Sequence, residues 1–260
     1  MRIGFYQFCP SFHNPELNLA RIAAALGHIK ADLIVLPEMC TTGYLFSSRE
    51  ELLRFAEPIP DGQSCRSMLE LCRRMNMAVV FGLAERAGDR IYNSAVLVTG
   101  SGETGVYRKA HLFADEKDMF EPGNTPFPVF DVGGVKVGML VCFDHFFPEA
   151  ARALALRGAQ IICHPANLVL DYAFMTSTCR TIENRVFWIL ADRTGSEKLT
   201  EREIRFVGRS QIVAPSGRLL YRAGADTEEL PVVEIDPREA LDKMVTPRNH
   251  LLSDRRTDLY

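Results

Sequence analysis

Three residues of this sequence combine reactive side chains with positions at or near the ends of apolar runs. Glu38 lies just after one such run, Lys109 lies in the segment 107–113, and Cys142 comes directly after a third run. Ligands of an α/β sheet bind at the carboxyl ends of its strands, so a carboxylate and a thiol at two such ends could converge on one pocket. Cys142 also precedes a helix expected to begin near Pro148, and a helix N-terminus or a nearby positive charge lowers the pKa of a thiol toward the reactive thiolate.

Each of these residues also has a simpler interpretation. A cysteine at the end of a buried strand is usually a small apolar filler. A glutamate or lysine after a strand is usually a solvated loop residue. Composition and pattern alone therefore predict an α/β protein with one chemically suggestive thiol.

Two other kinds of site are disfavoured by the sequence. Residues 100–105 form a literal Gly-x-Gly-x-x-Gly, but the helical apolar stripe that a dinucleotide site needs does not follow, so we interpret the segment as a hairpin turn. There is no Walker A sequence, and the six histidines and seven cysteines show no paired metal-ligand spacing. We expect no metal at the site.

The elements that must position these residues alternate between strands and helices. We expect helices around residues 19–26, 65–72 behind a cap at Ser64, 148–156 and 175–185. Strands are expected at residues 3–8, 32–36, 77–83, 91–112 (two runs around a turn), 127–132, 135–141, 160–163, 187–191, 208–213, 218–222 and 232–235. This order indicates one α/β domain over residues 1–260, with a polar tail from about residue 237. Cys65 and Cys72 fall on the apolar stripe of their helix and are predicted to be core residues.

Composition excludes several classes of protein. With 47% hydrophobic residues in 260, the chain can build a sizeable core, which rules out disordered, collagen-like and coiled-coil classes. The net charge of -3 is spread without long single-sign runs, so neither a nucleic-acid partner nor an anionic membrane is expected. The longest apolar stretch, residues 77–84, is far short of the roughly 20 residues that cross a bilayer. An odd number of cysteines in mostly apolar segments indicates reduced thiols and a cytoplasmic location.

Taken together, the three candidate positions resemble the signature of the nitrilase superfamily, the carbon-nitrogen hydrolases, in order and in spacing. The matching motifs are Leu36-Pro-Glu38 with Thr42-Gly-Tyr44, residues 107–113 around Lys109, and Val141-Cys142-Phe-Asp144 with Phe147-Pro-Glu149. Comparable flanking segments are Tyr92-Asn93-Ser-Ala, Glu121-Pro-Gly123, His164-Pro165-Ala-Asn167 and Glu183-Asn184-Arg185. The resemblance runs from residue 1 to about residue 235.

The resemblance implies a four-layer αββα sandwich, built as a single domain, that commonly associates through a helical face into homodimers or larger assemblies. It implies a triad of Glu38, Lys109 and Cys142 that needs no metal or organic cofactor. The family has a second glutamate between its lysine and nucleophile motifs. We place it at Glu116, with Glu121 and Asp118 as the alternatives. Substrate contacts are expected at Tyr44, Phe143, His145 and Asn167.

These residue types suit acyl transfer from a small amide. Cys142 would attack the amide carbon, and Glu38 would take the thiol proton and pass it to the leaving amine. Lys109 and the backbone N–H of Phe143 would hold the oxyanion, and such donors contribute on the order of 3 kcal/mol each. Glu38 would then activate water against the thioester.

The choice of substrate depends on Phe143-Asp144, where true nitrilases usually have Trp-Glu. We therefore expect a small amide or N-carbamoyl compound as substrate, with a nitrile as the alternative. His145 matches neither the arginine of several carbamoylases nor the glutamine or tryptophan of other branches, and it is interpreted equally well as a neutral pocket-wall or surface imidazole. The rivals from other classes are a catalytically silent binding protein of the same fold and a thiol sensor. The intact triad disfavours the first, and the absence of a Cys-x-x-Cys disfavours the second.

Overall fold

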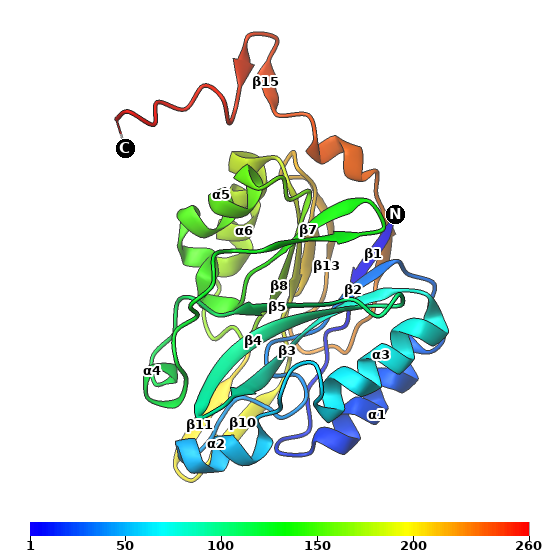
Figure 1. Ribbon diagram of the computed structural model, residues 1–260, viewed down its shortest axis with the longest axis vertical. Coiled ribbons are helices and arrows are strands. Elements are labelled where there is room, and N and C mark those ends of the chain that lie inside the picture. The colour runs from blue at the N-terminus through cyan, green and yellow to red at the C-terminus, as the bar shows by residue number, and fades with distance from the viewer. Residues whose placement is uncertain (260) are drawn as a thin grey trace.

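Two six-stranded sheets packed face to face form the centre of the molecule (Figure 1). The computed structural model describes residues 1–259. In order across the first sheet, the strands are β14 (Val232–Glu234), β1 (Arg2–Phe5), β2 (Leu33–Val35), β3 (Ala78–Ala87), β4 (Arg90–Thr99) and β5 (Thr104–Arg108). In order across the second sheet, they are β13 (Leu219–Arg222), β12 (Gln211–Val213), β9 (Phe187–Ala191), β8 (Ile161–Pro165), β7 (Val135–Met139) and β6 (Val129–Val132).

Each sheet has a parallel centre and antiparallel edges. The strands β1, β2 and β3 pair in parallel in the first sheet, as β7, β8 and β9 do in the second. Parallel strands are buried on both faces and read as nearly continuous apolar runs, which is why their positions could be predicted from the sequence. The carboxyl ends of these strands carry the loops that hold the candidate residues.

Four helices cover the outer faces of the two sheets. The helices α1 (Pro15–Leu26) and α3 (Gln63–Met75) pack on the first sheet, while α5 (Pro148–Leu156) and α6 (Tyr172–Asn184) pack on the second (Figure 1). The layers therefore run helix, sheet, sheet, helix, and the predicted four-layer α/β architecture is confirmed. The side chains between the sheets include Phe5, Val35, Ile161 and Ile189, all fully buried.

Local sequence explains where the first two covering helices begin. The Asn14 side chain accepts a hydrogen bond from the backbone N–H of Leu17, and proline occupies the first turn of α1. In α3, Cys65 and Cys72 lie on the buried stripe, as predicted. The predicted cap at Ser64 is wrong, because α3 begins two residues earlier than predicted, at Gln63 behind Gly62, and the Ser64 hydroxyl instead donates to Glu57 at 2.5 Å.

Several predicted boundaries also change. The α6 helix starts at Tyr172 rather than near residue 175, β12 starts at Gln211 rather than 208, and β7 ends at Met139 rather than 141. Residues 100–103 form the turn between β4 and β5, which confirms the hairpin interpretation of the glycine-rich segment. Elements that were not predicted are α2 (Arg49–Phe55), α4 (Glu116–Met119), the hairpin of β10 (Ser196–Leu199) and β11 (Arg202–Arg205), and the short 3-10 helix η1 (Cys142–Phe146).

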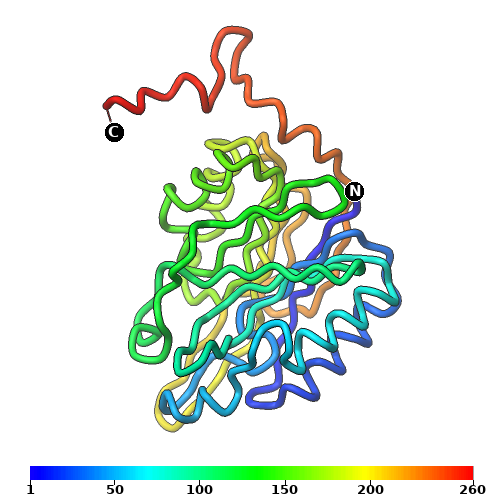
Figure 2. The backbone as a smooth tube through the Cα atoms, in the orientation of Figure 1, coloured from blue at the N-terminus to red at the C-terminus, as the bar shows by residue number. Residues whose placement is uncertain are grey.

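The C-terminal segment leaves the body of the molecule near the N-terminus (Figure 2). It contains the 3-10 helix η2 (Pro237–Ala240) and a small hairpin of β15 (Met244–Thr246) and β16 (Asn249–His250). Lys243 fastens its start to α6, because its ammonium donates to the carbonyl oxygens of Asn184 and Arg185 at 2.9 and 2.8 Å. Within residues 1–259, no helix is both long and apolar enough to span a bilayer.

Candidate active site

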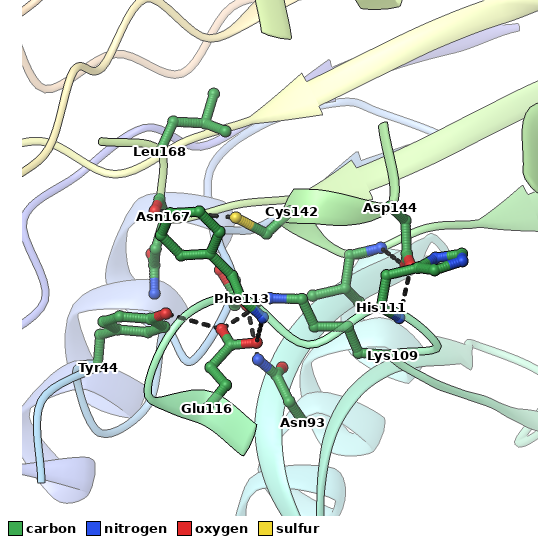
Figure 3. A network of polar contacts seen from close by, with 12 residues as sticks. Tyr44, Asn93, Lys109, His111, Phe113, Glu116, Cys142, Asp144, Asn167 and Leu168 are labelled. Atoms are coloured by element: carbon green, nitrogen blue, oxygen red, sulfur yellow. Dashed lines mark hydrogen bonds and ion pairs between the residues drawn. The ribbon is translucent and has the colours of Figure 1, made fainter. Parts of the chain in front are cut away.

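The predicted reactive residues lie together where strand ends of the two sheets meet. Glu38 follows β2 and Lys109 follows β5, both in the first sheet. Cys142 follows β7 and Asn167 follows β8, both in the second sheet. Figure 3 shows Cys142, Asn167, Lys109 and Glu116 converging on one small region between the sheets.

Lys109 is buried between two carboxylates. Its Nζ lies 2.8 Å from Oε1 of Glu38 and 2.7 Å from Oε1 of Glu116. Burial alone would lower the pKa of Lys109, but the charges of Glu116 and Glu38 outweigh it and raise the pKa above its ordinary value. The side chain is therefore an ammonium ion at neutral pH.

Glu38 has one carboxylate oxygen engaged and one without a partner. Oε1 accepts hydrogen bonds from Lys109 and, at 2.6 Å, from Nδ2 of Asn93, which lies on β4. Oε2 is buried and has no hydrogen-bond partner within residues 1–259. Burial raises the pKa of Glu38 against the opposing charge of Lys109. An unpartnered, more basic carboxylate oxygen is suited to accept a proton.

Glu116 is held on both of its oxygens. Its Oε1 accepts from Lys109 and from the Tyr44 hydroxyl at 2.7 Å, and its Oε2 accepts from the backbone N–H of Phe113 at 2.9 Å. The two alternative carboxylates lie elsewhere. Asp118 is exposed on α4, and Glu121 pairs with Arg49 at 3.3 Å. Of the three, Glu116 is the one in contact with Lys109.

Cys142 begins η1 in a backbone conformation that few non-glycine residues adopt. Its φ is 43°, in the left-handed region. The Sγ atom lies 3.8 Å from the backbone oxygen of Asn167, and the Cys142 carbonyl accepts a hydrogen bond from His164 at 2.8 Å. No glycine signals this turn in the sequence, so the pattern gave only a strand end.

The expected lowering of the Cys142 pKa is wrong. Burial, together with the nearby charge of Glu38, raises the pKa of the thiol well above its ordinary value, and the positive charge of Lys109 does not compensate. The thiol is therefore protonated in the resting site and needs a base to become a nucleophile.

Asp144 ties the Cys142 turn to the segment around Lys109. Its carboxylate accepts from the Tyr107 hydroxyl at 2.8 Å, from the Val141 N–H at 2.9 Å and from the His111 ring at 2.7 Å. Figure 3 shows Asp144 and His111 on the side away from Asn167 and Tyr44. Asp144 does not line the cavity beside Cys142, so its influence on a substrate acts through the position of the turn.

A narrow cavity opens beside the thiol. It holds about 20 Å³, which is room for about one water molecule, and its lining includes Phe113, Cys142, Phe143, His145, Phe146 and Asn167. Through Phe113 and Asn167 it adjoins a wider cleft of about 340 Å³ whose walls include Tyr44, Arg202 and Arg205. The residues expected to contact substrate are thus divided, with Phe143 and His145 at the cavity, Tyr44 at the cleft and Asn167 at both.

Two of these wall residues have informative polar atoms. Both side-chain polar atoms of Asn167 are buried without a hydrogen-bond partner within residues 1–259. Nδ1 of His145 lies 2.6 Å from the Thr176 hydroxyl, and burial lowers the pKa of His145 to about 4, so the ring is neutral at pH 7. Asn167 therefore offers a substrate an unused donor and an unused acceptor.

Sequence reasoning missed three contributors to the site. Asn93 was quoted only as part of a flanking segment, yet it bonds Glu38 directly. Phe113 and the β10–β11 hairpin form walls of the cavity and the cleft. Asn93 and Phe113 lie in segments that resemble the family, but their contacts depend on the tertiary fold, and no local pattern marks the hairpin.

Other parts of the described chain provide weaker candidates for a functional site. A separate open cleft of about 450 Å³ is lined by residues such as Asn76, Thr99 and Val135, and the reactive side chains are not among its walls. Within residues 1–259, no group of three or more His, Cys, Asp or Glu side chains is arranged to hold a metal ion.

Comparison with known proteins shows which families and structures this chain resembles in sequence and in fold. The family model for carbon-nitrogen hydrolases matches residues 4–241. The chain is 41% identical to a nitrilase of Pyrococcus abyssi over its whole length and 99% of that protein. It is 35% identical to an (R)-stereoselective amidase of Pseudomonas sp, over 98% of this chain and 92% of the other. A solved mutant of the amidase from Nesterenkonia sp. AN1, which shows Michael addition of acrylamide at its active site cysteine, matches with a TM-score of 0.81 at 28% identity, covering 100% of this chain and 98% of that one.

Proposed function

Because this chain belongs to the carbon-nitrogen hydrolase family, we propose that it hydrolyses a small amide or N-carbamoyl compound through a thioester on Cys142 and releases ammonia. One observation carries the proposal. The Cys142 thiol shares a buried site with a carboxylate that has a free oxygen, Glu38, and with the ammonium of Lys109. Nucleophile, base and cation are the groups that acyl transfer from an amide requires.

The first step forms the bond between Sγ of Cys142 and the amide carbon. The thiol proton moves to Oε2 of Glu38, and the carbonyl π electrons move onto oxygen. The Lys109 ammonium and the backbone N–H of Phe143 hold the resulting oxyanion. Because the thiol is protonated at rest, proton removal by Glu38 accompanies the attack.

The second step breaks the carbon–nitrogen bond. Glu38 returns its proton to the nitrogen, which leaves as ammonia, and the acyl group stays on Cys142 as a thioester. Water then attacks this thioester while Glu38 takes one of its protons. The sulfur–carbon bond breaks, the acid is released, and the proton returns to the thiol. The sum is one amide and one water converted to one acid and one ammonia.

The remaining residues bind and position. Glu116, held by Tyr44, fixes Lys109 through a second ion pair beside the one with Glu38. Asn167 offers its unpartnered amide to the polar atoms of the substrate, while Phe143 and His145 border the acyl group. A cavity of about 20 Å³ favours a compact acyl group, and the adjoining cleft gives it a path to solvent.

A nitrile is the alternative substrate, because one relative of 41% identity is described as a nitrilase. The amide is favoured by Phe143-Asp144 and by the likeness to two amidases. Since Asp144 acts only through the position of the turn, the preference depends on where Glu38 and Lys109 sit relative to the substrate nitrogen.

Ammonia release from matched substrates tests the proposal. Propionamide, N-carbamoyl-β-alanine and propionitrile are each incubated with the wild-type enzyme and with Cys142→Ala. We expect turnover of the amide or the carbamoyl compound with a higher kcat/KM than the nitrile, and none by Cys142→Ala. A nitrile preference of about tenfold or more across several acyl-matched pairs would show the branch assignment to be wrong. Absence of ammonia from every amide, carbamoyl compound and nitrile tried would favour the silent binding protein.

We further propose a homodimer or larger assembly and a cytoplasmic location for one domain of residues 1–260 with a tail from about residue 237. The helical face of α5 and α6 exposes Leu156, Met175 and Ile182, which supports association there. All seven cysteines, which lie within the described residues, are free thiols, as in a reducing compartment. Light scattering after size-exclusion chromatography measures the assembly directly.

A further inference from the structure

Two buried rings behind the nucleophile take no part in the mechanism above. His164 lies on β8, and its Nε2 is 2.8 Å from the carbonyl oxygen of Cys142. Trp188 lies on the neighbouring strand β9, and its Nε1 is 3.2 Å from Nδ1 of His164. Both side chains are fully buried, with their rings nearly perpendicular at 86°.

If both contacts are hydrogen bonds, the hydrogen atoms along the series Trp188, His164 and Cys142 can be placed in only one way. The indole N–H of Trp188 can only donate, so Nδ1 of His164 must be the bare, accepting nitrogen. A neutral imidazole carries its single hydrogen on the other nitrogen, which here is Nε2. That hydrogen points at the Cys142 carbonyl, which can only accept. Burial lowers the pKa of His164 to about 3, so the ring keeps this single hydrogen at neutral pH.

The Cys142 carbonyl belongs to the same peptide plane as the backbone N–H of Phe143. In a trans peptide the C=O and the N–H point in opposite directions, so whatever fixes one also aims the other. Phe143 is the second residue of η1, and the first N–H groups of a helix have no acceptor within it. This N–H is the backbone donor that the proposed mechanism gives to the oxyanion.

The peptide plane between Cys142 and Phe143 must be fixed by contacts from other residues, because the backbone conformation of Cys142 is unfavourable. A left-handed φ of 43° at a non-glycine residue persists only where surrounding contacts over-determine it. Asp144 fixes the preceding residue through the Val141 N–H. His164 fixes the following peptide through its oxygen.

We propose that His164, oriented by Trp188, is a positioning residue that aims the Phe143 N–H at the oxyanion by holding the carbonyl of Cys142. This inference rests on the proposed function, because it assumes that Cys142 is the nucleophile. It assigns the two rings a part in stabilising the transition state and none in activating the thiol.

Three variants separate this role from simple packing. His164→Met removes the donor at similar volume, His164→Gln restores an N–H near the position of Nε2, and Trp188→Phe removes the indole N–H while keeping a smaller aromatic ring. We expect kcat for propionamide to fall about 30-fold in His164→Met and about tenfold in Trp188→Phe, with KM changed less than threefold. His164→Gln should recover activity to within about fivefold of the wild type.

A second reaction at the same sulfur provides the control. Methyl methanethiosulfonate transfers a methylthio group to Cys142 by displacement of sulfinate, and no oxyanion forms at carbon. Because the other six cysteines are also free thiols, the modification is followed by mass spectrometry of the peptide that contains Cys142. We expect its rate with each variant to stay within threefold of wild type, because the thiol and Glu38 are untouched. Circular dichroism melting checks the fold of all variants, and emission from Trp188, the one tryptophan of the chain, checks its surroundings in the His164 variants.

The outcomes are distinct. Slow amide hydrolysis with unchanged thiol modification and rescue by His164→Gln supports the inference. Unchanged amide hydrolysis in both His164→Met and Trp188→Phe overturns it, as does a parallel loss of hydrolysis and thiol modification, or a glutamine variant no better than the methionine one. If His164→Met does not fold, Trp188→Phe decides by the same two rates. Amide turnover by Cys142→Ala would instead refute the proposed function.

Discussion

At the scale of single residues, burial decides which proton lies where. The site removes water from a thiol, two carboxylates and an ammonium, and it leaves the thiol protonated while Lys109 stays charged. Glu38 acts on Cys142 in two opposed ways. As a negative charge it raises the pKa of the thiol, and as a base it takes the thiol proton. These two effects can be separated by experiment.

Replacement of Glu38 by glutamine should separate them. Without the carboxylate charge, Cys142 faces the Lys109 ammonium with less opposition, so the pKa of the thiol should fall. Amide turnover should be lost, because the leaving nitrogen receives no proton. The pH dependence of thiol modification by methyl methanethiosulfonate measures the first effect, and ammonia release measures the second. A thiol pKa that rises or stays constant in Glu38→Gln would contradict the charge argument.

Removal of the thiol should abolish turnover and spare the fold. Cys142→Ala is expected to give no measurable ammonia, and Cys142→Ser at most a trace, because a hydroxyl is far harder to deprotonate. The matched controls are Cys65→Ala and Cys72→Ala, both in the buried stripe of α3. These should lower the free energy of unfolding by on the order of 1 kcal/mol and leave kcat unchanged. Retained activity in purified Cys142→Ala would eliminate the mechanism.

Lys109 and Glu38 should behave as one unit. They are 2.8 Å apart and serve the same transition state, so each single removal should cost nearly as much activity as the double removal. We expect this for Lys109→Met, Glu38→Gln and the pair, measured as kcat/KM. Lys109→Arg should also fail, because a planar guanidinium cannot replace a compact ammonium between two carboxylates. Additive losses would show that the two residues act independently.

At the scale of elements, the β10–β11 hairpin supports the site from outside. Glu197 on β10 accepts hydrogen bonds from the backbone N–H groups of Tyr44 and Leu45 at 2.9 and 2.8 Å, and it pairs with the buried Arg193. Gly43 has a φ of 87°, and a Cβ there would lie 2.6 Å from the Glu197 carboxylate. The hairpin thus fixes the loop whose Tyr44 hydroxyl holds Glu116.

Neutralising that carboxylate should weaken both fold and function. Glu197→Gln leaves the Arg193 guanidinium buried without its countercharge, which costs roughly 3–5 kcal/mol. The Tyr44 loop should loosen, so kcat should fall by more than KM rises. Urea unfolding and ammonia release measure the two effects. The exposed Glu201→Gln in the turn of the same hairpin is the control and should change neither. Equal effects of the two substitutions would show that the buried pair is unimportant.

The sequence predicted those elements whose pattern is local. The strand Phe187–Ala191 was predicted with its observed bounds because it is a continuous apolar run. The helix Pro148–Leu156 was predicted with its observed bounds because a proline begins it and a glycine follows its end. The left-handed turn at Cys142 and the β10–β11 hairpin were missed, since long-range contacts such as that of Glu197 with Tyr44 determine them.

The features of the candidate site also divide into those that the sequence could predict and those that depend on the fold. Glu38, Lys109 and Cys142 could be named from three motifs, and the structure brings them together. The direction of the thiol pKa shift could not be predicted, because it depends on the burial of Cys142 beside Glu38 rather than on the helix that follows in sequence. Asn93 was likewise hidden, because its contact with Glu38 crosses from β4 to the end of β2.

At the scale of the whole molecule, two buried neutral histidines should make the fold sensitive to acid. Burial lowers the pKa of His145 to about 4 and that of His164 to about 3, against about 6.5 in an unfolded chain. Their folded pKa values lie below the unfolded value, so the unfolded state binds protons first. The contribution of the two neutral histidines to the free energy of unfolding is fully present above pH 6.5 and is lost as the pH falls toward 4.

Comparison of the wild type with a variant that lacks His164 shows how much of this loss of stability is due to His164. Between pH 7.5 and pH 5, each histidine should reduce the free energy of unfolding by about 2 kcal/mol. His164→Gln should therefore show a shallower decline than the wild type when urea unfolding is measured at pH 7.5, 6.5, 5.5 and 5. Buried carboxylates such as Glu38 titrate in both proteins, so their effect cancels in the difference. Parallel curves would contradict the prediction.

The two-sheet construction of the site also orders events during synthesis. Glu38 and Lys109 belong to the first sheet and Cys142 to the second, while β14, near the end of the chain, pairs with β1 at the edge of the first sheet. A ribosome delivers the base and the ammonium before the thiol, and it delivers the strand that completes the first sheet after all three. A nascent chain that has emerged only as far as Cys142 holds these groups with only β6 and β7 of the second sheet, so most of the strands that bury the site are still missing. Under the proposed mechanism, a nascent chain at this stage is catalytically silent, and hydrolysis begins only after the later strands of both sheets have joined the fold.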